Sequence, residues 1–189
     1  MSKFIYLIGS LRNPEVPKVA KILRDAGHDV FDDWYAAGPE ADDHWMQYEK
    51  DRGSDFARAL DGYAARHVYE YDKSHLDRCG VGVLLMPAGK SGHLELGYMI
   101  GQGKPGYILL PSEPERYDVM YNFARGVYSN VDSLLKALAG PEYHVDTAFQ
   151  RTGKDFMGEK LRGGLFGTDY YKDPAEFYHK KMDGGFPRD

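Results

Sequence analysis

Short apolar runs alternate with helical segments along the first 140 residues, and this alternation constrains the fold more than any other feature. The run KFIYLIG (residues 3–9) has the apolar character of a strand buried on both faces. Apolar residues then recur at helical spacing from Val16 to Ala26, and Gly27 is a natural C-terminal cap. Similar runs predict strands within residues 28–34, 81–87 and 106–111, a helix around Glu95, and a last helix over residues 132–140.

Strands and helices that alternate with short connections are typical of a parallel sheet covered by helices. We therefore expect an α/β fold of the Rossmann-like or flavodoxin-like kind, an open parallel sheet with helices on both faces. Residues 41–78 are charged and longer than one crossover helix needs, and they predict a flap of two helices, broken near Gly53, over the carboxyl edge of the sheet. Residues 141–189 are rich in glycine and aromatic residues and predict an irregular C-terminal arm rather than an independent domain.

The composition excludes several classes of protein. The 189 residues carry a formal net charge of −5, which argues against a protein that binds duplex nucleic acid by neutralising its phosphates. The single cysteine, Cys79, excludes an intrachain disulfide, and its place before an apolar run favours a buried thiol. The N-terminus reads as a strand, and no apolar run approaches the roughly 18 residues of a membrane span. We expect a cytoplasmic protein without a membrane partner.

In an open parallel sheet, ligands bind outside the carboxyl ends of the strands, where the strand order reverses. The loops that follow the first three strands are rich in glycine, hydroxyl, guanidinium and carboxylate groups. In the first loop, GSLRN, backbone amides and the Arg12 guanidinium suit a phosphate, although a simple turn with a solvent-facing arginine is the alternative. The residues expected to line the binding site are Gly9, Ser10, Arg12, Asp33, Trp34, Gly89, Ser91, Gly92 and His93.

Glu95 stands in the segment GKSGHLELGYMIGQGKP (residues 89–105), about one turn into a helix that Ser91 is expected to cap. A carboxylate that only complemented the helix dipole would contribute about 0.3–1 kcal/mol, and a surface position would suffice for it. Apolar neighbours predict instead a helix buried on all sides, where a carboxylate without a task is costly. We therefore expect a functional carboxylate; His93 either reaches the same pocket or lies at its rim.

Asp72 precedes the third strand by about two helical turns, so it is expected to point towards the same edge of the sheet as Glu95. Asp77 is the competing carboxylate, and a solvated helix face is the alternative for Asp72. Two carboxylates on either side of a C–N glycosidic bond would supply a nucleophile and a general acid/base. The sequence contains no His-Glu-x-x-His spacing, and we expect neither a metal nor another cofactor.

Together, the run YLIGSLR, an aspartate before an apolar strand and the segment GHLELGYMIGQGKP resemble the nucleoside 2-deoxyribosyltransferase family over residues 3–111. The Gly-Ser-x-Arg loop is most similar to that of the 2′-deoxynucleoside 5′-monophosphate N-glycosidases. The resemblance implies that Glu95 is the nucleophile, that Asp72 is the acid/base or a partner of a sugar hydroxyl, and that Tyr6, at the end of the first strand, orients the nucleophile. It also implies a 5′-phosphate held by Ser10, Arg12 and Ser91.

The expected function is therefore cleavage of the N-glycosidic bond of a (deoxy)nucleoside 5′-monophosphate, with residues 1–140 as the nucleotide-binding catalytic domain. Transfer of the sugar between bases, a nucleotide-binding module without turnover and a purely structural protein are the alternatives. The resemblance further implies a homodimer or a higher homo-oligomer, because the family often completes its sites with residues from a neighbouring subunit.

Overall fold

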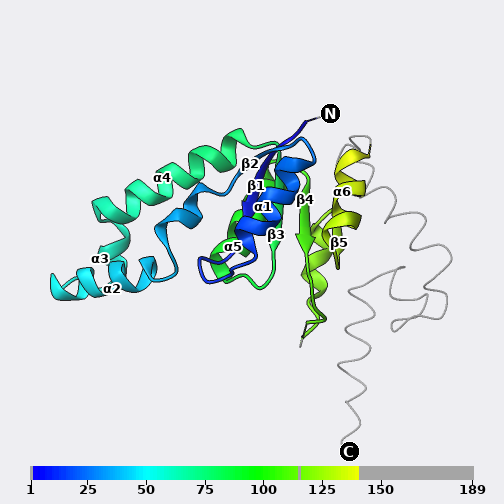
Figure 1. The fold of residues 1–189 in the computed structure, drawn as a ribbon. Helices are drawn as coiled ribbons and strands as arrows, with labels where there is room; N and C mark the ends of the chain where they lie inside the picture. Colours follow the sequence, from blue (N-terminus) through cyan, green and yellow to red (C-terminus); the bar gives the residue numbers. More distant parts are fainter. Residues whose placement is uncertain (1, 115, 141–189) are drawn as a thin grey trace, which may run out of the picture. The chain divides into compact units, whose positions relative to one another are not determined.

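A computed structural model gives the structure of the chain and describes residues 2–114 and 116–140. The predicted C-terminal arm, residues 141–189, lies outside the described residues. Among the described residues, five parallel strands form one sheet (Figure 1). In their order across the sheet they are β2 (Asp29–Phe31), β1 (Phe4–Ile8), β3 (Val81–Leu85), β4 (Gly106–Leu109) and β5 (Gly126–Tyr128).

This strand order is that of flavodoxin-like sheets, and it reverses between β1 and β3. The predicted α/β class, the parallel sheet and four of its strands are confirmed. The helices are α1 (Val16–Asp25), α2 (Ala41–Asp51), α3 (Phe56–Leu60), α4 (Tyr63–Arg78), α5 (Lys90–Gly101) and α6 (Val131–Ala139), with the 3₁₀ turns η1 (Asp33–Ala37) and η2 (Val119–Phe123).

Side chains of β1 alternate between two cores, as the two-residue period of a strand requires. Ile5 and Leu7 belong to one buried cluster, together with Val19 and Leu23 of α1 and Leu134 of α6. The other cluster, on the opposite face, contains Tyr6 and Ile8 of β1 with Leu76 of α4, Leu96 and Met99 of α5, and buried residues of the neighbouring strands. The sheet is therefore covered by α1 and α6 on one face and by α4 and α5 on the other.

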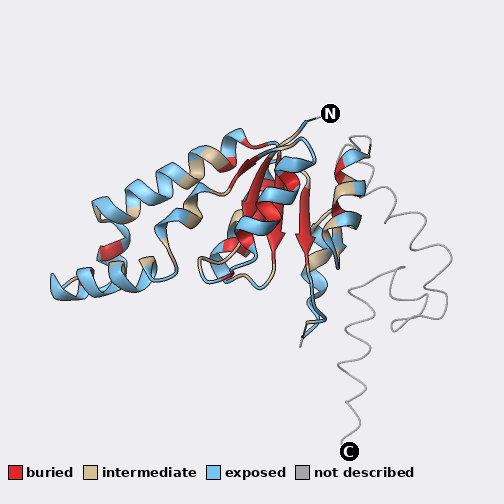
Figure 2. Ribbon diagram, in the orientation of Figure 1, coloured by how far each residue is buried: buried red, intermediate tan, exposed pale blue. Residues whose placement is uncertain are grey.

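The segment between η1 and β3 differs in part from the prediction. The expected break at Gly53 is present, with a positive φ of 75° that glycine adopts readily. A second break, at residues 61–62, divides the rest into α3 and α4, so the segment contains three helices rather than two. Figure 2 shows α2, α3 and the first half of α4 almost entirely exposed; the buried residues of α2 and α3 are Glu49 and Ala59.

None of the helices in the described part of the chain combines the length and the hydropathy that a membrane crossing requires.

Candidate active site

Three polar side chains, one each from β1, α4 and α5, converge on the face of the sheet that α4 and α5 cover. Tyr6 of β1 is 1% exposed, and its hydroxyl interacts by a hydrogen bond with the carboxylate of Asp72 on α4. The Glu95 carboxylate, on α5, is close enough to both groups to act on them electrostatically. The fold thus brings together the three residues that the sequence singled out as catalytic.

Backbone periodicity explains why these side chains meet. Tyr6 lies in the middle of β1, not at its end as expected, and its position in the strand alternation directs it to the face covered by α4 and α5. Asp72 is one turn before the buried Leu76 of α4, so the two share the helix face that approaches the sheet. Glu95 is adjacent to the buried Leu96 and lies half-buried at the margin of the packed face of α5.

Burial controls the charge of the two carboxylates. It raises the pKa of Glu95 to about 7, and the negative charge of Asp72 adds to the effect. Burial also raises the pKa of Asp72, while His75 and the hydrogen bond from Tyr6 act in the opposite direction. A carboxyl group with a pKa near neutral, as at Glu95, can gain or lose a proton at physiological pH, and such groups act as nucleophiles or as general acids and bases.

The Tyr6 hydroxyl stays protonated over the whole physiological range. Its pKa is raised by burial first and then by the charges of Glu95 and Asp72. A neutral phenol donates its proton in a hydrogen bond without adding charge to the site. Tyr6 is therefore a neutral hydrogen-bond donor to the Asp72 carboxylate, and the role of orienting the nucleophile, which the family resemblance implies, stays a prediction.

An aromatic group that the sequence analysis missed covers the Tyr6 side of the cluster. The rings of Phe31 and His75 stack with centroids 3.8 Å apart and planes 11° apart, and Tyr71 lies against both. Phe31 also contacts Tyr6, with centroids 4.9 Å apart. Phe31 is 3% exposed, so the group packs against Tyr6 through a buried ring. The i, i+4 spacing of Tyr71 and His75 in YEYDKSH was the available signal.

A hollow lies between the loops that follow β1 and β3, where the strand order reverses. Its lining residues are Ser10, Arg12, Asn13, Pro87, Ala88 and Gly89. Asn13 is 4% exposed, and its side-chain nitrogen has no hydrogen-bond partner among the described residues. The sequence predicted Ser10, Arg12 and Gly89 for this place; Asn13 was missed because its burial depends on the fold.

Arg12 already has a partner from the inserted helices. Its Nη2 lies 2.7 Å from Oδ2 of Asp43, in the first turn of α2, and the two side chains are 62% and 57% exposed. An exposed pair of this kind contributes little to stability, about 0–1 kcal/mol. The Arg12 guanidinium is therefore held at the hollow by a weak contact, and an anionic ligand can replace the Asp43 carboxylate.

The start of α5 corrects the expectation for Ser91. The N-cap is Gly89, in extended conformation, and Ser91 is the second residue of the helix, with an exposed side chain. No side chain caps this end of α5. The first backbone N–H groups of α5 therefore face the hollow beside Gly89 without a capping acceptor, an arrangement that favours an anion.

The prediction that the Glu95 helix is buried on all sides is wrong. Leu94 is 75% exposed and Tyr98 is also exposed, while Gly92, Leu96 and Met99 are buried. The helix packs on the sheet through one face, and α4 covers only part of its other faces. Glu95 is consequently at the margin of the core and is partly exposed.

The other predicted binding residues serve mainly local structure. His93 Nδ1 lies 2.8 Å from the Gly89 carbonyl, so this nitrogen carries the proton, and Nε2 lies 3.0 Å from the Tyr121 hydroxyl. Trp34 donates from Nε1 to the Leu7 carbonyl at 2.9 Å. Asp33 is exposed at the start of η1.

Gly9 and Gly92 allow close packing around the hollow. A Cβ on Gly9 would lie 3.0 Å from Val16 Cγ2, and one on Gly92 would lie 3.0 Å from Leu84 Cδ1. Both glycines therefore let the loop after β1 and the first turn of α5 approach their neighbours. Their contribution to the site is the shape of the backbone.

Solved structures provide the comparison for this arrangement. The chain is similar to a 2-deoxyribosyltransferase from Bacillus psychrosaccharolyticus, with 21% identity, a TM-score of 0.50, and coverage of 77% of this chain and 95% of the other. The chain has the 2-deoxyribosyltransferase fold. A conserved protein from Enterococcus faecalis V583 gives a TM-score of 0.51 at 14% identity, over 72% of this chain and 96% of the other.

A further similar structure is the CMP N-glycosidase of Clostridium botulinum, with 14% identity, a TM-score of 0.44, and coverage of 72% of this chain and 98% of the other. No protein-family model and no curated protein matches the sequence. Over residues 2–114 and 116–140, no group of three or more His, Cys, Asp or Glu side chains is arranged to hold a metal ion.

Proposed function

We propose that the protein is an enzyme that cleaves the N-glycosidic bond of a (deoxy)nucleoside 5′-monophosphate. The observation that carries the proposal is the convergence of Tyr6, Asp72 and Glu95 in a fold that also has a hollow lined by Arg12 at the strand-order reversal. The fold shared with a 2-deoxyribosyltransferase supports the same class of chemistry, because that protein acts on the bond between a sugar and a base.

In the proposed reaction, an oxygen of the ionised Glu95 attacks C1′ of the sugar. A C–O ester bond forms, the C1′–N bond breaks, and its electron pair leaves with the base, which takes a proton from Asp72. Water then attacks C1′ and gives a proton to Asp72, which returns Glu95 as a free carboxylate and releases the sugar 5-phosphate. This step requires a protonated Asp72 beside an ionised Glu95, and the burial that raises the pKa of Asp72 acts in the direction that a proton donor requires.

The hollow supports a monophosphate over an unphosphorylated nucleoside. Arg12, the Ser10 hydroxyl and the uncapped start of α5 can all donate hydrogen bonds to phosphate oxygens. The buried amide nitrogen of Asn13 is a further donor at the same place. In this proposal the phosphate takes the place of the Asp43 carboxylate on Arg12.

Sugar transfer is the second candidate, and the similarity to a 2-deoxyribosyltransferase favours it. The first half-reaction is the same, and a second base replaces water as the acceptor of the sugar. The two candidates differ only in what reacts with the glycosyl ester, so one assay with and without a free acceptor base distinguishes them.

Base release from a panel of nucleosides and their 5′-monophosphates, followed by chromatography, tests the proposed function. We expect release from at least one monophosphate, and a loss of at least about 100-fold in Glu95→Gln and in Asp72→Asn. Release that is unchanged in Glu95→Gln would contradict the mechanism. Binding of a nucleotide with a raised melting temperature and no turnover would indicate instead a nucleotide-binding module.

A further inference from the structure

The helix that carries Asp72 has little apolar contact with the rest of the protein. Of the 16 residues of α4, only Leu76 is buried. A helix usually depends for its stability on the packing of an apolar face, and this one has a single anchored turn. The orientation of α4, and with it the position of Asp72, must therefore depend on polar contacts near its C-terminal end.

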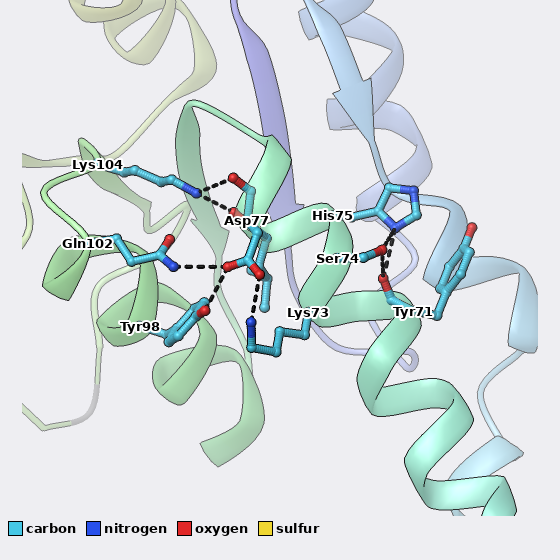
Figure 3. A network of polar contacts seen from close by, with 9 residues as sticks. Tyr71, Lys73, Ser74, His75, Asp77, Tyr98, Gln102 and Lys104 are labelled. Carbon is cyan, nitrogen blue, oxygen red and sulfur yellow. Dashed lines mark hydrogen bonds and ion pairs between the residues drawn. The ribbon is translucent and has the colours of Figure 1, made fainter.

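Asp77 supplies these contacts across the gap to α5 (Figure 3). Its Oδ1 accepts hydrogen bonds from the Tyr98 hydroxyl at 2.6 Å and from Gln102 Nε2 at 2.9 Å. Its Oδ2 accepts from Lys73 Nζ, one turn earlier on α4, at 2.6 Å. The same three hydrogen bonds hold the pKa of Asp77 well below its ordinary value, so the carboxylate is charged throughout the physiological range.

Lys104, which follows α5, donates hydrogen bonds to main-chain carbonyl groups of the same turn of α4. Its Nζ donates to the carbonyl oxygens of Leu76 at 2.6 Å and of Asp77 at 2.8 Å. Both acceptors lie in the last turn of the helix, where carbonyl groups lack partners inside the helix. On the other side of α4, His75 stacks on Phe31 of β2. The last two turns of α4 are thus held both by α5 and by β2.

The dimensions of the helix decide how much this clamp matters. Asp72 and Asp77 are five residues apart, about 7.5 Å along the axis. A tilt of roughly 10° at Asp77 would move Asp72 by about 1 Å, and a displacement of that size can cost about 100-fold in rate. Lys73, which belongs to the clamp, is also the immediate neighbour of Asp72 in the chain.

We propose that Asp77 is a positioning residue that fixes α4 against α5 and so holds the Asp72 carboxylate at the Glu95 carboxylate. The inference rests on the proposed function for its catalytic consequence, but its structural part is independent of turnover. Asp77 was the competitor of Asp72 for the catalytic role in the sequence. The structure gives it hydrogen bonds with Lys73 of α4 and with Tyr98 and Gln102 at the end of α5 (Figure 3).

The test compares Asp77→Ala and Asp77→Asn with the wild-type protein in two measurements. The first is kcat and KM for base release, and the second is the pKa of the Glu95 carboxyl group by ¹³C NMR titration. Asp77→Ala is expected to lower kcat about 10- to 100-fold with little change in KM. The pKa of Glu95 should fall towards its ordinary value, because Asp72 moves away and water enters. Asp77→Asn keeps an oxygen for Tyr98 and Gln102 and should lie between.

Asp25→Asn is the matched control. Asp25 forms an ion pair with Lys21 at 2.5 Å, with the same i, i+4 spacing as Lys73 and Asp77, but within α1 on the opposite face of the sheet. This variant should leave kcat and the Glu95 titration unchanged. Equal behaviour of Asp77→Ala and Asp25→Asn, with both proteins folded, would overturn the proposal.

Two further outcomes are separated by the design. If Asp77→Ala does not fold, Tyr98→Phe and Gln102→Ala each remove one bond to Asp77, and smaller changes in the same direction support the proposal. Values equal to those of Asp25→Asn overturn it. If the wild-type protein releases no base from any substrate, the proposed function fails, and the Glu95 titration alone decides whether Asp77 positions Asp72.

Discussion

Glu95 is placed where two physical requirements oppose each other. In the proposed function Glu95 must be ionised to attack the sugar, whereas burial and the nearby charge of Asp72 favour its protonated form and raise its pKa to about 7. The position at the margin of the core reconciles the two, since water is partly excluded and a ligand can still approach. Activity that depends on ionised Glu95 should therefore rise with pH through about 7.

The same shift makes a prediction about stability. Between the ordinary pKa of a glutamate and about 7, the folded protein binds more protons at Glu95 than the unfolded chain, so stability is lost as the pH rises through this range. Glu95→Gln should raise the free energy of unfolding at pH 8 by up to about 3 kcal/mol, and the gain should shrink at pH 5. Chemical denaturation at the two pH values measures this.

Glu70→Gln on the exposed face of α4 is the control, with an expected change within about 0.5 kcal/mol at both pH values. A gain for Glu95→Gln that is the same at pH 5 and pH 8 would show that the carboxyl group is not titrating in this range.

Arg12 determines the preference for a phosphate in the proposed function. Arg12→Ala should lower the ratio of kcat/KM for a monophosphate over its nucleoside by about 10- to 100-fold, because a charged hydrogen-bond donor is lost. Asp43→Asn, which removes the competing carboxylate, should lower KM for the monophosphate. Steady-state kinetics on matched substrates gives both values. An unchanged ratio in Arg12→Ala would place the phosphate elsewhere.

At the scale of the elements, a glycine in the first turn of α5 lets this helix, which carries Glu95, pack closely on the sheet. A Cβ on Gly92 would lie 3.0 Å from Leu84 and 3.1 Å from Ile8, both fully buried, so neither neighbour can move easily. Gly92→Ala should therefore cost about 1–3 kcal/mol of stability. Gly97, on the same helix, has open space around its Cβ position, and Gly97→Ala should stabilise by about 0.4–1 kcal/mol.

Thermal unfolding of the two variants checks this prediction, with Gly97→Ala as the internal control for helix propensity. A higher melting temperature for Gly92→Ala than for the wild-type protein would mean that the first turn of α5 is not held as closely against β1 and β3 as the structure indicates.

The elements also show what sequence patterns can predict. Long apolar runs, as in β1 and β3, locate strands to within about two residues, since every side chain of such a strand is buried or nearly so. The edge strand β5 was missed because its three residues are partly or fully exposed and give no apolar run. The prediction that Ser91 is the N-cap was wrong because the N-cap is Gly89, two residues earlier, in extended conformation.

The residues of the candidate site likewise fall into those that sequence patterns predicted and those that they missed. Tyr6, Asp72 and Glu95, which the structure brings together, were predicted as one group because each lies in a segment that the family resemblance covers. Asn13, Asp43 and the Phe31–His75 stack depend on contacts between distant parts of the chain. Contacts between residues far apart in the chain produce no repeating pattern in a single sequence, so they could not be predicted from it.

At the scale of the whole molecule, the described part of the chain combines a well-packed sheet with a helical segment, from α2 to the first half of α4, that has few buried side chains. The residues of β1, β3 and β4 are almost all buried, whereas α2, α3 and the first half of α4 are mostly exposed (Figure 2). Apolar side chains exposed on these helices include Phe56, Tyr63 and Tyr69. A segment with so few buried side chains is at the low end of local stability.

Hydrogen exchange followed by mass spectrometry tests this difference. Amides of α2 and α3 should exchange much faster than those of β1 and β3 in dilute protein, and they should gain protection as the concentration rises if a second copy covers them. Protection equal to that of the sheet at every concentration would contradict the description of this segment as weakly packed.

The most direct test of the central claim is mass spectrometry of the peptide that contains Glu95, after incubation with a hydrolysable monophosphate and an acid quench. The proposed mechanism predicts a glycosyl ester on Glu95, seen as the added mass of the sugar phosphate, and its absence in Glu95→Gln. Turnover accompanied by an adduct on a different carboxylate, or by the same adduct in Glu95→Gln, would contradict the assignment of Glu95 as the nucleophile.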